Sequence, residues 1–331
     1  MRAIRPSALK KEIKANALAD IPTMIWGGPG IGKSAIPAAI AASENAVFRD
    51  LRINLYDPVD IRGGLKLVEE NGKWRTKYGV PEDYPDPDYQ GTVYFMMDEL
   101  TSAPKATMNA CLQLTLDKRI GAYTLPKHTI IIAAGNRAKD RAAVHDMPTP
   151  LKNRFAHYEL EANIDDVISY AMRANWDESI ISFLRYRPAL LHSVDANENA
   201  FPSPRTWEML SKKLPFAVDD FYAAASLVGD GPAGEFVAFK SIYKDIPDID
   251  GILNNPGQSK VPESTSVLYA ICGALSSRAT PENFNAIVKY INRMPAEYQV
   301  IVIRDSIAKD RSLITHEKFQ KWSDDNADVL L

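Results

Sequence analysis

The stretch "TMIWGGPGIGKSAIP", from Thr23 to Pro37, constrains the fold more than any other part of this chain. It matches the pattern G-x-x-x-x-G-K-S/T completely and lies between a short apolar run and a helical stretch, which gives strand, loop and helix. Glycines let such a loop turn tightly and point backbone N–H groups at phosphate oxygens, and the following helix N-terminus adds positive partial charge. A turn that binds nothing is the alternative. The predicted phosphate-contacting residues are Gly28, Pro29, Gly30, Ile31, Gly32, Lys33 and Ser34.

Two carboxylates follow a second apolar run, "VYFMMDEL". Val93 to Met97 read as a buried parallel strand, which would deliver Asp98 and Glu99 to the carboxyl edge of a sheet. We expect Lys33 to reach the β and γ phosphates of a nucleotide. Ser34 and Asp98 are the predicted Mg²⁺ ligands, Asp98 directly or through water, and Glu99 would orient or deprotonate the attacking water.

The order of elements predicts an α/β domain followed by helices. Strand-like runs at "FRDLRINL", "TVYFMMDE" and "HTIIIAAGN" alternate with helical segments, one of which carries a predicted apolar stripe. After Glu161 the segments read helical, including the ambiguous "YQVIVIRDSI". We therefore expect a P-loop NTPase sheet sandwiched by helices over residues 1–160, a helical lid over 161–250 and a helical extension over 251–331. The predicted stripe consists of Met108, Cys111, Leu112 and Leu116.

Composition narrows the class of protein. The 331 residues include 39 basic and 42 acidic ones, so the net charge of −3 provides no general field for nucleic acid, although a local patch stays open. Cys111 and Cys272 match no metal or redox spacing, which fits a reducing compartment. The longest apolar run is too short to span a bilayer, and no apolar region follows the basic start. We expect a soluble, cytoplasmic protein.

Six motifs in a fixed order resemble those of AAA+ ATPases, and within them the MoxR branch. The resemblance covers Ile21 to Leu214 and implies an AAA+ core that binds and hydrolyses ATP with Mg²⁺. The motifs are "GGPGIGKS", "DPVDIRGG", "MMDELTSAPKATMNACLQLTLDKRI", "IIAAGNRA", "PLKNRF" and "SPRTW".

Three further site residues come from this resemblance. Asn136 matches sensor 1, which holds the attacking water and senses the γ-phosphate. Arg154 matches the arginine finger that reaches a neighbouring subunit's site, with Lys152 as its substitute, and Arg205 matches sensor 2 in the lid. A turn asparagine and a surface arginine are the plain alternatives for Asn136 and Arg154.

The resemblance also implies partners. A finger that acts between subunits requires a homo-oligomeric ring, expected to be a hexamer. MoxR-like proteins typically work with a von Willebrand factor A partner and remodel a client protein. The insertion from Asn71 to Gln90 departs from the family and would face either the pore or solvent, and "VEENGKWR" predicts a hairpin within it. The charged segment 137–148 is an interface loop or solvated surface.

Two other functions stay open on the sequence. A nucleic-acid-stimulated AAA+ motor would need a basic loop in the pore, for which Lys66, Lys73, Arg75 and Lys77 are the candidates. A nucleotide-dependent scaffold would organise a partner without cycling. A GTPase is disfavoured because the sequence has no N-K-x-D segment.

Overall fold

The computed structural model describes residues 2–120, 123–137, 145–195, 197–243 and 246–326. They form two compact units, Met1–Glu161 and Ala162–Leu331, each described here by itself. Most of the charged segment 137–148 lies outside the described residues. Among those residues, no helix combines the length and the apolarity needed to cross a membrane. The division at residue 250 stays a prediction.

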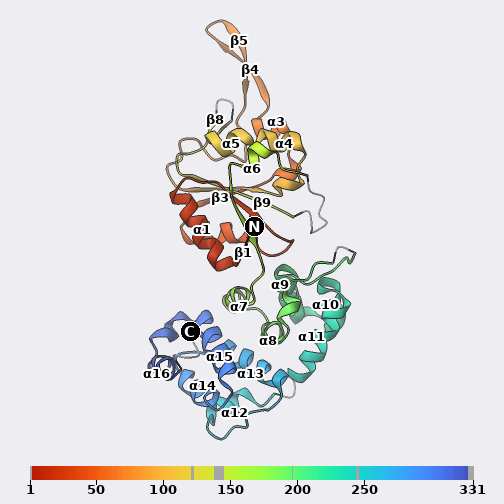
Figure 1. Ribbon diagram of the computed structural model, residues 1–331, viewed down its shortest axis with the longest axis vertical. Helices are drawn as coiled ribbons and strands as arrows, with labels where there is room; N and C mark the ends of the chain where they lie inside the picture. Colours follow the sequence, from red (N-terminus) through yellow and green to blue (C-terminus); the bar gives the residue numbers. More distant parts are fainter. Residues whose placement is uncertain (1, 121–122, 138–144, 196, 244–245, 327–331) are drawn as a thin grey trace. The chain divides into compact units, whose positions relative to one another are not determined.

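The first unit is built on a six-stranded parallel sheet (Figure 1). Its strands lie in the order β1-β10-β2-β9-β6-β3, so the strand before the glycine-rich loop is central. The strands are β1 (Ala3–Ile4), β2 (Thr23–Trp26), β3 (Val47–Arg52), β6 (Val93–Asp98), β9 (Thr129–Gly135) and β10 (Ala156–Leu160).

Successive side chains of β6 point to opposite faces of the sheet, and both faces are covered by helices. Phe95 and Met97 pack with the helices that follow β6, whereas the hydroxyl of Tyr94 donates to Glu44 at the end of α2, on the other face. The predicted fold class, a P-loop NTPase sheet with helices on both faces and a helical region after it, is confirmed. The helices of this unit are α1 (Pro6–Leu18), α2 (Ala35–Ser43), α3 (Pro58–Arg62), α4 (Lys105–Ala110), α5 (Leu112–Asp117) and α6 (Thr149–Lys152), with 3₁₀ turns η1 (Ile53–Leu55) and η2 (Leu100–Ser102).

The predicted apolar stripe holds only in part. Cys111 ends α4 and begins α5, so the helix is interrupted there. Met108 and Cys111 are buried as expected, but Leu116 is 61% exposed, and Leu114 takes the buried position in α5. Because of this break, α5 packs on the sheet through Leu114 and not through Leu116.

Two small hairpins complete the unit. The predicted hairpin is confirmed: β4 (Leu65–Glu70) and β5 (Lys73–Tyr78) pair antiparallel across Asn71-Gly72 and project from the body of the unit (Figure 1). A shorter pair is formed by β7 (Arg119–Ile120) and β8 (Tyr123–Thr124).

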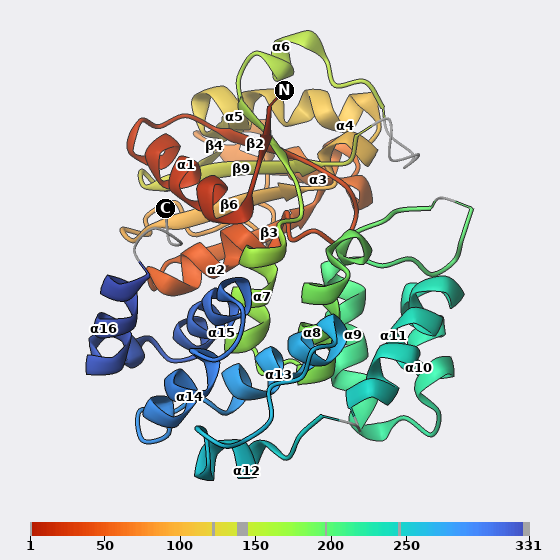
Figure 2. The ribbon, with the colours of Figure 1, turned by 60° about the horizontal axis from the view of Figure 1, so that its bottom comes forward.

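The second unit is helical over its described residues (Figure 2). One apolar cluster surrounds Phe183, Trp207 and Phe236, another surrounds Phe284 and Tyr290, and α13 contributes residues to both. The segment "YQVIVIRDSI" is helical, as predicted. The helices are α7 (Ile164–Arg173), α8 (Glu178–Tyr186), α9 (Pro204–Lys213), α10 (Asp220–Val228), α11 (Asp230–Tyr243), α12 (Ile249–Asn254), α13 (Thr265–Arg278), α14 (Phe284–Ile291), α15 (Ala296–Lys309) and α16 (Glu317–Asp325), with 3₁₀ turns η4 (Pro188–Leu191), η5 (Leu214–Phe216) and η6 (Arg311–Thr315).

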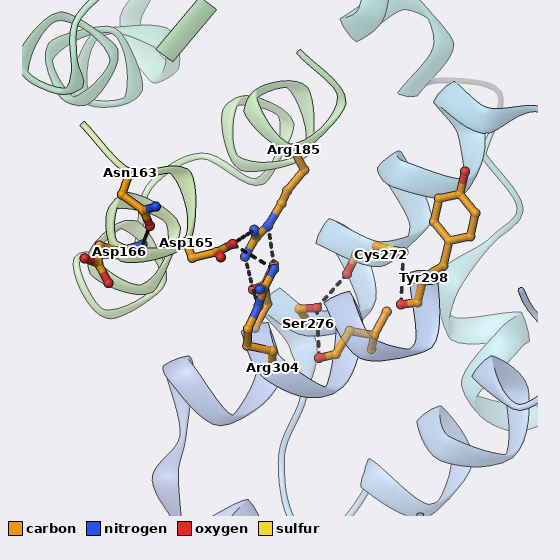
Figure 3. A network of polar contacts seen from close by, with 10 residues as sticks. Asn163, Asp165, Asp166, Arg185, Cys272, Ser276, Tyr298 and Arg304 are labelled. Atoms are coloured by element: carbon orange, nitrogen blue, oxygen red, sulfur yellow. Dashed lines mark hydrogen bonds and ion pairs between the residues drawn. The ribbon is translucent and has the colours of Figure 1, made fainter. Parts of the chain in front are cut away.

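A buried ion network joins three helices of this unit (Figure 3). Arg185 on α8 donates from Nε to Asp305 Oδ2 on α15 at 3.1 Å and from Nη1 to Asp165 Oδ1 on α7 at 2.6 Å. Arg304 Nη2 lies 3.0 Å from the same Asp165 oxygen. The side chains of Arg185 and Asp305 are only 6% and 2% exposed. Such charges are stable in the interior only while they stay paired.

Candidate functional site

The glycine-rich loop runs from the end of β2 to the start of α2, as the sequence predicts. Gly30 and Gly32 have φ of 76° and 96°, a region that favours glycine. A Cβ on Gly27 would lie 2.4 Å from Ile31 Cδ1 and 2.9 Å from the Leu160 carbonyl oxygen, so no larger residue fits there. These restrictions explain the glycines at positions 27, 30 and 32. Contact of the loop with phosphate stays a prediction.

Lys33 is buried at the base of this loop with 7% of its surface exposed. Its ammonium donates to the carbonyl oxygens of Gly27 and Gly28 at 3.0 and 2.9 Å and to Asn136 Oδ1 at 2.7 Å. These three oxygens hold the ammonium in place at the loop. A phosphate oxygen at the loop carries negative charge and would therefore offer Lys33 a stronger partner than a neutral oxygen.

The end of β6 brings two carboxylates to the loop. Ser34 Oγ donates to Asp98 Oδ2 at 2.5 Å, and the Glu99 N–H donates to the other Asp98 oxygen at 2.9 Å. Glu99 has φ 52° and ψ 31°, a left-handed conformation that is uncommon for a residue with a side chain. Backbone strain of this kind persists where the surroundings fix it, and it is concentrated at functional sites.

Asn136, at the end of β9, connects the lysine to the second carboxylate. Its Nδ2 donates to Glu99 Oε2 at 3.0 Å, while its Oδ1 accepts from Lys33. Ser102 Oγ donates to the same Glu99 oxygen at 3.0 Å. Glu99 Oε2 thus receives two hydrogen bonds. Lys33, Ser34, Asp98, Glu99 and Asn136 lie together at the carboxyl edge of the sheet.

The donor set of this cluster suits a hard cation. The Ser34 hydroxyl and the Asp98 carboxylate are oxygen ligands of the kind that Mg²⁺ takes, and Mg²⁺ commonly completes its octahedron with water and substrate phosphates. Over the described residues, no group of three or more His, Cys, Asp or Glu side chains could hold a metal. A Mg²⁺ ion held by Ser34 and Asp98 would take its remaining ligands from water and from the phosphates.

Two further predicted site residues are arginines on other segments of the chain. Arg154 follows α6, and its Nη1 donates to the Pro150 carbonyl at 2.5 Å. No hydrogen bond joins Arg154 to Lys33 or Glu99 in the described part of the chain. Arg205 is exposed near the start of α9, a helix capped by Ser203, in the other unit. The roles of both arginines stay predictions.

The sequence reasoning missed one participant, Ser102. The only signal is its position three residues after Glu99, where the turn η2 returns the hydroxyl to the carboxylate. Serine is too common in turns for that spacing to predict a contact.

The chain is similar to solved structures at low sequence identity. No protein-family model and no curated protein matches the sequence. NtrX from Brucella abortus in complex with ADP resembles the chain with a TM-score of 0.41 at 15% identity, over 98% of this chain and 68% of that one. A RuvB mutant from Thermotoga maritima has a TM-score of 0.41 at 14% identity, over 82% of this chain and 80% of that one.

Proposed function

We propose that this protein is an AAA+ ATPase of the MoxR-like type that couples hydrolysis of Mg-ATP in an oligomeric ring to remodelling of a client protein. One observation carries the proposal: Lys33, Ser34, Asp98, Glu99 and Asn136 meet in one hydrogen-bonded cluster beside a glycine-rich loop. A cation for phosphate, two oxygen ligands for a metal, and a carboxylate for water are the parts that phosphoanhydride hydrolysis needs.

Each residue of the cluster has a role in the proposed reaction. The amides of the loop and Lys33 bind the β and γ phosphates, and Ser34 and Asp98 hold the metal. Bound Mg²⁺ supplies charge neutralisation at the phosphate oxygens. Glu99 accepts a proton from the attacking water through Oε1, because Oε2 is held by Asn136 and Ser102.

The ring belongs to the proposal because Arg154 matches a finger that acts between subunits. Arg154 would complete a neighbouring subunit's site and stabilise charge on the transferred phosphoryl group, which can contribute on the order of 10³ in rate. Arg205 would contact nucleotide from the helical unit of the same chain. A von Willebrand factor A protein and a protein client are the proposed partners, and the cytoplasm is the proposed compartment.

A nucleic-acid-stimulated motor is the second candidate, for one reason. The register of the β4-β5 hairpin places Lys66, Lys73, Arg75 and Lys77 on the same face. Stimulation of the ATPase by single-stranded DNA or RNA that weakens steeply with added salt would favour this candidate.

The first test is the ATPase rate as a function of protein concentration, with the mass in solution measured with and without ATP and Mg²⁺. We expect activity per subunit to rise steeply as a ring forms. Constant activity from a monomer would reject the ring and the finger and leave a self-contained P-loop enzyme.

Mixing two inactive variants tests the finger itself. Arg154→Ala should assemble but hydrolyse poorly, and Lys33→Ala should fail to bind ATP. In a mixed ring, Arg154→Ala subunits retain a nucleotide site that a Lys33→Ala neighbour completes with its arginine. We expect activity to return in part. A mixture that forms rings without recovering activity would exclude a finger acting between subunits.

A further inference from the structure

The β4-β5 hairpin has two faces of opposite chemistry. Its turn, Asn71-Gly72, has φ of 52° and 72°, as a two-residue hairpin turn requires, and the strands pair in register from Leu65 with Tyr78 to Glu70 with Lys73. Since alternate residues point to opposite faces, the register sorts the side chains. One face carries Lys66, Val68, Glu70, Lys73, Arg75 and Lys77, and the other carries Leu65, Leu67, Glu69, Trp74, Thr76 and Tyr78.

The apolar face is open to solvent. Leu65, Leu67 and Trp74 are 63%, 70% and 68% exposed, and Tyr78 is 41% exposed. Single exposed apolar residues are ordinary, but four on one face of one hairpin form a patch of the kind that marks an interaction site.

The opposite face has unneutralised positive charge. Lys77 forms an ion pair with Glu70, whereas Lys66, Lys73 and Arg75 form no ion pair within the described residues. A partner on this face should therefore carry negative charge.

Both outer edges of the hairpin are available for pairing. β4 and β5 pair only with each other among the described strands. With Glu70 and Lys73 as the hydrogen-bonded pair that closes the turn, the backbone groups of every second residue point outward, among them those of Leu67 and Trp74. An extended chain can add to such an edge as a third strand.

We propose that the hairpin binds an extended segment of a partner protein in which acidic and apolar residues alternate. In a third strand, the carboxylates of such a segment point to the face of the lysines and its apolar side chains to the face of Leu67 and Trp74, because both strands have the same period of two. The segment lies directly beside Lys66 and Leu67 if it joins the edge of β4, and beside Lys73 and Trp74 if it joins the edge of β5. The binding of such a segment does not depend on the proposed function. Only the statement that the segment belongs to the client protein rests on the proposed ATPase function.

A nucleic acid fits the same surface less well. Its phosphates would satisfy the cationic face, and a base could stack on Trp74. It offers nothing to Leu65 and Leu67 and no strand to the outward backbone groups. The combination of charge, apolar area and free edge is therefore matched by a polypeptide.

The test measures binding of labelled octapeptides to the full-length protein by fluorescence anisotropy at low salt. The main probe alternates glutamate and valine. A second peptide has the same composition with its glutamates and valines in separate blocks, and a third alternates lysine and valine. Two N-methylated forms of the main probe, blocked on one edge or the other, test strand addition. Single-stranded oligothymidylate tests the nucleic-acid reading.

We expect the alternating acidic peptide to bind at least about tenfold more tightly than the block peptide and the lysine peptide. One of the two N-methylated forms should lose at least about tenfold in affinity, since methylation removes donors on one edge only. The double change Lys66→Glu with Lys73→Glu should weaken the main probe by at least about tenfold whichever edge the peptide joins, since the lysine beside it becomes a repulsive glutamate and the second lysine of the same face also reverses its charge.

A matched variant controls for net charge. Lys11→Glu with Lys321→Glu makes the same charge change at exposed positions on α1 and α16, and we expect its affinity for the main probe to stay within about twofold of that of the unchanged protein. Circular dichroism and melting temperature check that both variants fold.

Three results would overturn the proposal: equal binding of the block and alternating peptides, an equal loss in the two charge-reversal variants, or no peptide binding while oligothymidylate binds. The ATPase rate of the unchanged protein separates the two proposals. Normal turnover without peptide binding rejects only the hairpin inference, and peptide binding without turnover rejects only the ATPase.

Discussion

The substitution Glu99→Gln tests the role of the cluster most directly. Glu99 Oε2 accepts hydrogen bonds from Asn136 Nδ2 and Ser102 Oγ, both at 3.0 Å. The carbonyl oxygen of a glutamine can accept both, so the side chain keeps its position and only the basic oxygen is replaced, by an amide group. The substitution therefore removes a proton acceptor without removing a structural contact.

The expected magnitude follows from that geometry. Loss of a positioned general base costs about 10²- to 10⁴-fold in rate, or about 3–5 kcal/mol in the barrier. ATP affinity should change by less than about threefold, a shift of under about 0.7 kcal/mol, because Lys33, Ser34 and Asp98 are unchanged.

The assay is single-turnover phosphate release with Mg²⁺, together with ATP affinity by calorimetry. Glu82→Gln is the control, since Glu82 is an exposed carboxylate of the same unit; we expect wild-type turnover from it. Turnover above about a third of wild type in Glu99→Gln would refute the assignment of the base. Loss of ATP binding would refute the claim that Glu99 acts on water alone.

Three further predictions test the site and the two units. Ser102→Ala should lower kcat with little change in KM, measured by steady-state ATPase assays, because Glu99 loses one of the two donors that orient it; an unchanged kcat would leave Ser102 without a role. Arg185→Met should lower the unfolding free energy in urea by about 3–5 kcal/mol, because Asp305 stays buried and loses its guanidinium, and Arg185→Met with Asp305→Leu should recover much of the loss; a double variant as unstable as the sum of the single changes would contradict this. Burial raises the pKa of the Cys111 thiol to about 12, so native Cys111 should not react with iodoacetamide at pH 8 and should react in denaturant, where the thiol pKa is about 8.5; rapid labelling of the native protein, read by mass spectrometry, would show that the thiol is not buried.

Local patterns predicted much of the fold because their physics is local. The loop at Gly27–Ser34 needs glycines for its backbone angles, and β6 needs an uninterrupted apolar run because both of its faces are covered. The turn at Asn71-Gly72 predicted the hairpin for the same kind of reason, since those two residues tolerate positive φ.

Two neighbouring strands on one side of the sheet, β1 and β10, were missed for a physical reason, whereas β3 at the opposite edge was predicted. β10 reads "AHYEL" and is only partly buried, and β1 is two residues long. Neither has the apolar run that marks a central strand, and both are fixed by pairing with a neighbour far away in sequence. Pairing of that kind leaves no local signal.

The residues of the candidate site could be predicted from the sequence, but the contacts between them could not. Motifs predicted Lys33, Ser34, Asp98 and Glu99, and the sheet order brings them together. The link from Lys33 through Asn136 to Glu99 depends on β2, β6 and β9 ending at one edge, and the contact of Ser102 depends on one turn of backbone. Those distances follow from the three-dimensional arrangement and not from any spacing in the chain.

The ion network of the helical unit also sets an order of events during synthesis. Arg185 precedes its buried partner Asp305 by 120 residues, which a ribosome adding about 5–20 residues per second takes roughly 6–24 s to make. During that interval α8 has been made but has no carboxylate from α15 to pair with. The first unit contains every residue of the phosphate-loop cluster and is finished well before then. The phosphate site of the nascent chain should therefore be able to form before α15 is synthesised and the helical unit can complete its ion network.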